Sequence, residues 1–184
     1  DLFVANYFKE FYFEQALFGT HNLAILNHYS INEEYEPGND ELYLNIGGKS
    51  FKNVSNFLKC NPGYGFGAVF TDVDNDNDLD IYLVNDFGEN NEPNQILINQ
   101  YPKLDFENKS KELKLNVGLK SMGVGVGDYN NDSYLDYHVT NIFAGPFMVN
   151  RGKDKSFVNL APNIGTGINK IEGYKDSKQV IIGW

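Results

Sequence analysis

Cysteine is nearly missing from this 184-residue sequence, and its scarcity narrows the chemistry of the chain. Cys60 is the single cysteine, so the chain holds no internal disulfide and no metal site built from several cysteines. The three histidines show no spacing typical of metal ligands, and no Ser-His-Asp set stands out. The residues therefore indicate no catalytic site, and we predict that the chain is not an enzyme.

Basic residues are also few, with 15 Lys and Arg against 25 Asp and Glu and a formal net charge of −10. An acidic chain without basic stretches is poorly suited to bind nucleic acid or anionic membranes. No apolar run reaches the length of about 18 residues that a membrane-spanning helix needs. We therefore predict no nucleic-acid partner and no membrane insertion.

The sequence begins at Asp1 without an initiator Met or a signal peptide, which indicates a fragment of a longer protein.

Acidic residues are instead concentrated in two short segments. Residues 72–80 read Asp-Val-Asp-Asn-Asp-Asn-Asp-Leu-Asp, and residues 128–136 read Asp-Tyr-Asn-Asn-Asp-Ser-Tyr-Leu-Asp. Each segment places oxygen-bearing side chains at relative positions 1, 3, 5 and 9, and a hard cation such as calcium takes about six to eight oxygen ligands. Clustered carboxylates repel one another when no cation is bound. Two calcium ions are predicted, one in each loop, held by the side chains of Asp72, Asp74, Asp76 and Asp80 and of Asp128, Asn130, Asp132 and Asp136.

The sequence around the two loops repeats. Residues 80–85 match residues 136–141, and both match residues 1–6, which places Asp1 at the ninth position of a third loop. Short runs rich in β-branched and aromatic residues follow each match, separated by Asn, Gly and Pro, and a Gly-rich run precedes each complete loop. This pattern predicts an all-β chain with about four strands per unit.

The period of the repeat is 56 residues from Asp80 to Asp136, and four strands at such a period are typical of β-propeller blades. Because a propeller closes with about four to eight blades, we predict an incomplete arc of about three blades in a larger ring. The predicted units are an incomplete blade over 1–56 with an insert at 7–40, blades over 63–110 and 120–162, and the start of a further blade at 178–184. The insert begins with apolar residues near helical spacing, which predicts a short helix over 7–18. Since the insert joins the second and third strands, we expect it on the face opposite the loops.

The segments 65–85 and 122–141 resemble FG-GAP/VCBS repeats, as in the N-terminal propeller of integrin alpha chains. The stretch from Ser121 to Asp132, followed by Val-Thr-Asn141, is most similar to the ASPIC/UnbV branch, which includes cartilage acidic protein-like sequences. The resemblance implies a calcium-binding propeller used for adhesion, recognition or scaffolding, with a protein or glycan partner and further blades of the same parent chain. It also implies that Asp78 and Tyr134, at position 7, bind the ion through their backbone carbonyls.

The family usually carries Gly at position 6, where the chain turns sharply, but this sequence has Asn77 and Ser133 there. Asn tolerates a positive φ better than Ser does. The second loop also offers three side-chain carboxylates where the first offers four. We therefore predict that calcium binds the second loop more weakly.

The two Asp-rich loops admit other interpretations. An EF-hand loop needs a carboxylate at position 12, where the two loops have Leu83 and Val139, so this alternative is excluded. The loops could instead be solvated turns, or the chain could be an accessory propeller of a carbohydrate-active enzyme such as a polysaccharide lyase. A cytoplasmic structural protein with empty loops is a third alternative.

Extracellular calcium modules work at affinities of about 10⁻⁴–10⁻³ M, so we predict an extracellular, periplasmic or cell-surface location.

Overall fold

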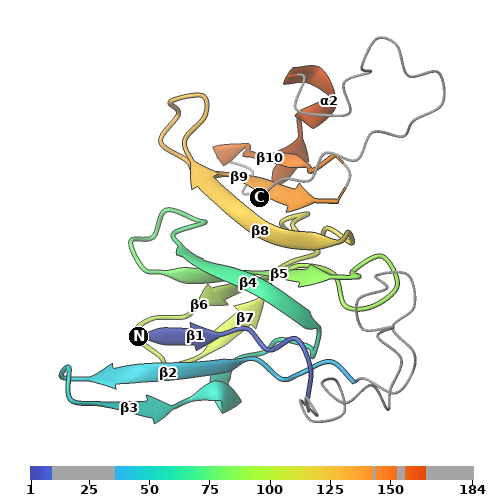
Figure 1. Cartoon of the computed structure of the whole chain (residues 1–184). Coiled ribbons are helices and arrows are strands. Elements are labelled where there is room, and N and C mark those ends of the chain that lie inside the picture. The colour runs from blue at the N-terminus through green and yellow to red at the C-terminus, as the bar shows by residue number, and fades with distance from the viewer. Residues whose placement is uncertain (10–35, 143, 153–155, 165–184) are drawn as a thin grey trace, which may run out of the picture.

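Three antiparallel β-sheets make up the described part of the chain, which confirms the all-β prediction (Figure 1). The computed structural model describes residues 1–9, 36–142, 144–152 and 156–164. The helix predicted over 7–18 and the blade start predicted at 178–184 lie wholly or mostly outside these ranges. No helix in the described part is long and apolar enough to cross a membrane.

The first sheet has three strands in the order β1-β2-β3. These strands are β1 (Leu2–Val4), β2 (Glu41–Ile46) and β3 (Ser50–Asn53), and a 3-10 turn, η2 (Ser55–Phe57), follows them. The turn between β2 and β3 contains Gly47 and Gly48, whose φ angles are 60° and 71°. Glycine adopts this left-handed backbone without the steric cost that a Cβ atom adds, which explains the Gly-Gly pair at this tight turn.

The second and third sheets each have four strands, and both follow the same plan. The second sheet runs in the order β4-β5-β6-β7, and the third runs from β8 through β9 and β10 to β11. Their strands are β4 (Tyr64–Thr71), β5 (Asp80–Asp86), β6 (Gln95–Asn99), β7 (Phe106–Asn108), β8 (Ser121–Gly127), β9 (Asp136–Asn141), β10 (Phe147–Asn150) and β11 (Phe157–Asn159). A short helix, α2 (Ala161–Ile164), follows β11.

The register of the two four-stranded sheets matches in detail. The pairing of β4 with β5 shifts between Gly65 and Gly67, and the pairing of β8 with β9 shifts between Ser121 and Gly123. These bulges lie at equivalent places in the repeat, 56 residues apart. A bulge bends a strand and increases its twist, so both sheets bend at the same point.

Apolar side chains pack between neighbouring sheets. One core cluster joins the second and third sheets through residues such as Tyr82, Ile96, Tyr137 and Phe157, all of which are nearly inaccessible to solvent. A smaller cluster around Leu42, with Val54, Ile81, Leu97 and Phe106, joins the first sheet to the second. The sheets therefore pack face against face in chain order, with the first and third sheets on either side of the second (Figure 1).

Candidate metal loops at one end of the sheets

The first Asp-rich loop connects β4 to β5 and is shaped by its own carboxylates. Asp72 accepts hydrogen bonds from the backbone N–H groups of Asp76 and Asn77, each at 3.1 Å. Asp76 in turn accepts one from the N–H of Asp78 at 3.0 Å. The backbone is left-handed at Asn75 and Asn77, with φ of 60° and 70°. The sharp turn predicted at position 6 is therefore present, and position 4 makes a second one.

Asp80 fixes the end of the first loop against the sheet. Its side chain is fully buried and accepts hydrogen bonds from the N–H groups of Val73, at 2.9 Å, and Asn99, at 2.8 Å. Burial raises the pKa of Asp80 to about 7, since the charged form loses its hydration, although these two hydrogen bonds act in the opposite direction. A nearby cation would favour the charged form of this carboxylate.

Three carboxylates of the first loop come together in a way that fits one cation. Oxygen atoms of Asp72, Asp74 and Asp80 all lie within 4.8 Å of one another. Calcium–oxygen distances are about 2.3–2.6 Å, so two oxygens on opposite sides of one ion lie about 5 Å apart. Burial, with smaller contributions from the charges of the neighbouring aspartates, raises the pKa of Asp78, and its Oδ1 atom has no hydrogen-bond partner in the described structure. The donor set therefore suits a hard divalent cation.

The second loop, between β8 and β9, repeats these contacts residue for residue. Asp128 accepts from the N–H groups of Asp132, at 3.1 Å, and Ser133, at 2.9 Å. Asp136 accepts from the N–H groups of Tyr129 and Asn150, both at 2.8 Å. The φ angle of Ser133 is 71°, which matches that of Asn77. The two loops therefore share one backbone conformation.

The loops differ at their third position. Asp74 belongs to the three-carboxylate group of the first loop, whereas Asn130 uses its Nδ2 atom to donate to Asp132 Oδ2 at 2.9 Å. Among the described residues, this group in the first loop is the one set of three His, Cys, Asp or Glu side chains whose ligand atoms all lie within 4.8 Å of one another. The ligand roles assigned to the ten residues of the two loops, including the carbonyls of Asp78 and Tyr134, stay predictions.

A contact that the sequence reasoning missed links each ninth-position Asp to an asparagine in the third strand of its unit. Asp80 binds the N–H of Asn99, and Asp136 binds the N–H of Asn150. Asp1 makes the equivalent contact, since its Oδ1 accepts from the N–H of Asn45 at 3.0 Å. The recurrence of Asn near the end of β2, β6 and β10 was the available signal.

A second set of asparagines lies at the ends of the strands opposite the loops. The Nδ2 atoms of Asn6, Asn85 and Asn141 donate to the backbone carbonyls of Asn39, Pro93 and Ala144 respectively. Each asparagine thus closes the turn that follows its strand.

The insert begins at this opposite end. Tyr7 donates its hydroxyl hydrogen to Asp86 Oδ2 at 2.8 Å, and Asp86 ends the strand that Asp80 begins. A rise of about 3.4 Å per residue puts these two ends about 20 Å apart. Lys9 and Glu36 form an ion pair at 2.8 Å that ties together the two described ends of the insert. The rest of the insert, residues 10–35, lies outside the described residues.

The two loops also contact each other across the boundary between the sheets. Asn75 donates through Nδ2 to the carbonyl of Ser133 at 3.0 Å. Beneath the loops, Asn150 donates through Nδ2 to the carbonyl of Val73 at 3.2 Å, and the hydroxyls of Thr71 and Tyr137 lie 2.9 Å apart. The first loop therefore packs on the third sheet as well as on its own.

The FG-GAP-like repeat family matches residues 72–139, from the first residue of the first loop into β9. This match confirms the FG-GAP resemblance for that stretch, while the closer assignment to the ASPIC/UnbV branch stays a prediction. No curated protein matches the chain.

Proposed function

We propose that the chain is an arc of a calcium-stabilised β-propeller that acts as a non-catalytic binding or scaffold module. The observation that carries the proposal is the carboxylate group of Asp72, Asp74 and Asp80, whose oxygens lie within 4.8 Å of one another. The equivalent backbone contacts in the second loop support a second site of the same kind. The FG-GAP-like repeat over 72–139 supports the propeller architecture.

Calcium has a structural role in this proposal. When bound, the ion neutralises the clustered carboxylates. Asp72 and Asp128 hold the turn of each loop by accepting hydrogen bonds from its backbone N–H groups. Asp80 and Asp136 attach the end of each loop to the neighbouring strand. Because the first loop contacts the second loop through Asn75 and β10 of the third sheet through Val73, shaping the first loop also stabilises the boundary between two sheets.

We propose that the partner binds at the end of the sheets opposite the Asp-rich loops. The insert begins there, its first aromatic residue is fixed to Asp86, and its ends are joined by Lys9 and Glu36. Tyr7, Phe8 and Tyr64 pack ring against ring at this end, with ring centroids 4.7–6.1 Å apart, and give the insert a rigid base. We propose a protein or glycan partner at this surface, further blades of the parent chain beside the arc, and an extracellular, periplasmic or cell-surface location.

Thermal unfolding in calcium and in chelator tests the metal role. Because a metal that binds only the folded loop stabilises by mass action, about 10 mM calcium at a dissociation constant of about 10⁻⁴ M adds about 2.7 kcal/mol per site. The double substitution D74N/D76N should remove most of the gain from the first loop. E112Q, which changes an exposed acid in the turn after β7 and outside both loops, serves as the control and should keep the full gain. An unfolding temperature that is equal in calcium and chelator would refute the structural role of calcium.

Glycan-array binding and a screen for polysaccharide cleavage test the rest of the proposal. Binding that is lost when residues 10–35 are replaced by a short Gly-Ser linker, while the calcium effect remains, would support the insert end as the binding surface. Cleavage of a polysaccharide by this protein would contradict the non-catalytic assignment.

A further inference from the structure

A chain of three buried hydrogen bonds joins the two Asp-rich loops. Asp80 Oδ2 accepts from the N–H of Val73 at 2.9 Å, and the carbonyl of Val73 accepts from Asn150 Nδ2 at 3.2 Å. The backbone N–H of Asn150 donates in turn to Asp136 Oδ1 at 2.8 Å. All four residues are at most 4% exposed. The ninth-position aspartate of the first loop is therefore connected to that of the second through Val73 and Asn150.

Asn150 is central to this chain because both of its nitrogen atoms take part. Its backbone N–H lies at the end of β10 and holds Asp136. Its side-chain amide reaches the loop of the preceding sheet at Val73. The Oδ1 atom of the same amide accepts from the N–H of Gly152 at 3.0 Å, which fixes the direction in which Nδ2 points. A shift of Val73 therefore acts on the residue that holds Asp136.

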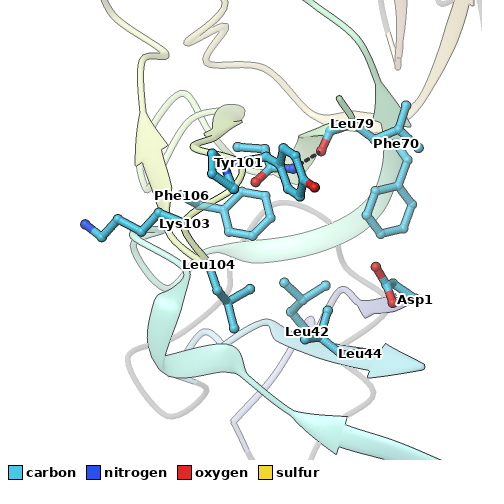
Figure 2. A pocket seen from close by; sticks show the side chains of 11 residues that line it. Asp1, Leu42, Leu44, Phe70, Leu79, Tyr101, Lys103, Leu104 and Phe106 are labelled. Atoms are coloured by element: carbon cyan, nitrogen blue, oxygen red, sulfur yellow. Dashed lines mark hydrogen bonds between the residues drawn. The ribbon is translucent and has the colours of Figure 1, made fainter. Parts of the chain in front are cut away.

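Asn99 is the counterpart of Asn150 in the second sheet and makes a different side-chain contact. Its backbone N–H binds Asp80 as that of Asn150 binds Asp136. Its Nδ2 atom donates to the carbonyl of Leu79 at 3.3 Å, within the loop of its own sheet (Figure 2). Asn99 thus has the backbone role of Asn150 without the link between two loops, which makes it a matched control.

Two further contacts hold the loops in place relative to each other. The carbonyl of Ser133 accepts from Asn75 of the first loop, and the N–H of Ser133 donates to Asp128 at 2.9 Å. Thr71, directly before the first loop, and Tyr137, directly after the second, have buried hydroxyls 2.9 Å apart. The first and the ninth aspartate of the second loop therefore each bind a residue that the first loop also contacts.

We propose that Asn150 is a positioning residue that couples the two proposed metal sites, so that calcium at the first loop tightens binding at the second. The inference rests on the proposed calcium role and adds the regulation of the same loops. A first loop fixed in one shape holds Val73 and Asn75 in place, so the residues that position the second loop are already ordered. A ligand that binds an already ordered protein loses less conformational entropy. By linkage, the second site must tighten the first by the same factor.

Calcium titration followed by nuclear magnetic resonance measures the two sites separately. The amide signals of Asn77 and Ser133 each report on one loop, because each N–H donates to the first aspartate of its own loop. Disabling the first loop with D74N/D76N should raise the dissociation constant of the second loop at least about fivefold, the lower end of typical coupling between sites.

The reciprocal variant D128N/D132N disables the second loop. It should raise the dissociation constant of the first loop by the same factor, because coupling free energies are symmetric. E112Q, outside both loops, should change neither constant.

N150A decides whether Asn150 carries the coupling. It keeps the backbone N–H that binds Asp136 and removes the amide that reaches Val73. In the N150A protein, adding D74N/D76N should change the dissociation constant of the second loop less than about twofold. In the N99A protein the full fivefold effect should remain, because the amide lost there binds within its own loop.

N75G is a second uncoupling variant, needed because N150A also removes the buried bond to Gly152. Asn75 is exposed, and its replacement removes the other direct link between the loops. N75G should reduce the effect of D74N/D76N on the second loop, and N131G, at the same position of the second loop, should not.

The outcomes separate this inference from the calcium proposal. Two loops that bind calcium with dissociation constants independent of each other would overturn the inference and leave the structural role of calcium intact. A full fivefold effect that persists in both N150A and N75G would also overturn it, since the coupling would then not pass through these amides. Absence of calcium binding at both loops would refute the proposed function, and the inference with it.

Discussion

Asn75 in the first loop donates its side-chain amide to the backbone carbonyl of Ser133 in the second loop, at 3.0 Å. This bond joins two loops whose corresponding residues are 56 positions apart in the sequence. It connects position 4 of one loop with position 6 of the next, and both residues have a positive φ. The shape of one loop is therefore coupled directly to the shape of the other.

Replacing Asn75 with Gly should separate this coupling from backbone strain. Glycine keeps the left-handed conformation without a Cβ penalty, but the variant loses the bond to Ser133. Asn131 is the counterpart in the second loop, with φ of 57° against 60° for Asn75, so N131G is the control. We expect N75G to be less stable than N131G by about 1 kcal/mol in urea unfolding, since one hydrogen bond contributes about 0.5–1.5 kcal/mol. Equal stabilities would show that the bond contributes nothing.

Ser133 is itself an unfavourable residue for its position. Its φ of 71° lies in the region where an L-residue other than Gly, Asn or Asp pays about 1–2 kcal/mol. S133G should therefore stabilise the protein by about 1 kcal/mol in chelator. N77G, at the same position of the first loop, should change stability less, because Asn tolerates this conformation better. Differential scanning calorimetry of both variants measures the contrast, and a larger gain from N77G would contradict it.

The short repeats made the strands and both Asp loops predictable, because β-branched runs, turn residues and carboxylate spacing all lie within about ten residues of each other. The sharp turn at position 6 of each loop was predictable from the family resemblance, because the family usually carries Gly there. The bond from Asn75 to Ser133 was not predictable in this way, because it depends on how two sheets pack. The exposure of the Phe70 and Leu79 side chains was not predictable for the same reason, because it also depends on how the sheets pack.

Metal binding can be tested by exchanging the residue types, Asp and Asn, at the third position of the two loops. N130D places a carboxylate where the first loop has Asp74, and it replaces the amide that donates to Asp132. In chelator this change should destabilise the protein through repulsion between carboxylates. In calcium it should tighten the second site several-fold, because the ion gains a charged ligand.

D74N is the reciprocal variant and should weaken the first site by a similar factor while relieving repulsion in chelator. Isothermal titration calorimetry with calcium, combined with unfolding in chelator, gives both quantities for each variant. If N130D lowers stability equally in calcium and in chelator, the second loop does not bind the ion. A tighter second site in the unsubstituted protein would reverse the predicted ranking.

Asp40 is a buried carboxyl at the end of the sheets opposite the loops, and we expect it to make stability depend on pH. Its side chain is 3% exposed, and its Oδ1 atom accepts from the N–H of Asn6 at 2.9 Å, while Oδ2 has no hydrogen-bond partner in the described structure. Burial raises the pKa of Asp40 to about 6, although the bond from Asn6 lowers it. In the second sheet the same position holds Asn94, whose Oδ1 accepts from the N–H of Asn85 at 2.9 Å.

A carboxyl whose pKa is higher in the folded state favours folding below its unfolded pKa of about 3.9, and that advantage is lost as pH rises through about 6. D40N keeps the acceptor for Asn6 and removes the charge. It should therefore stabilise the protein by as much as about 3 kcal/mol at pH 8, and by clearly less at pH 5. E36Q, which removes an exposed carboxylate paired with Lys9, should give no such gain at pH 8. Urea unfolding of the three proteins at both pH values measures the difference, and a gain from D40N that is the same at pH 5 and pH 8 would show that Asp40 is not the titrating group.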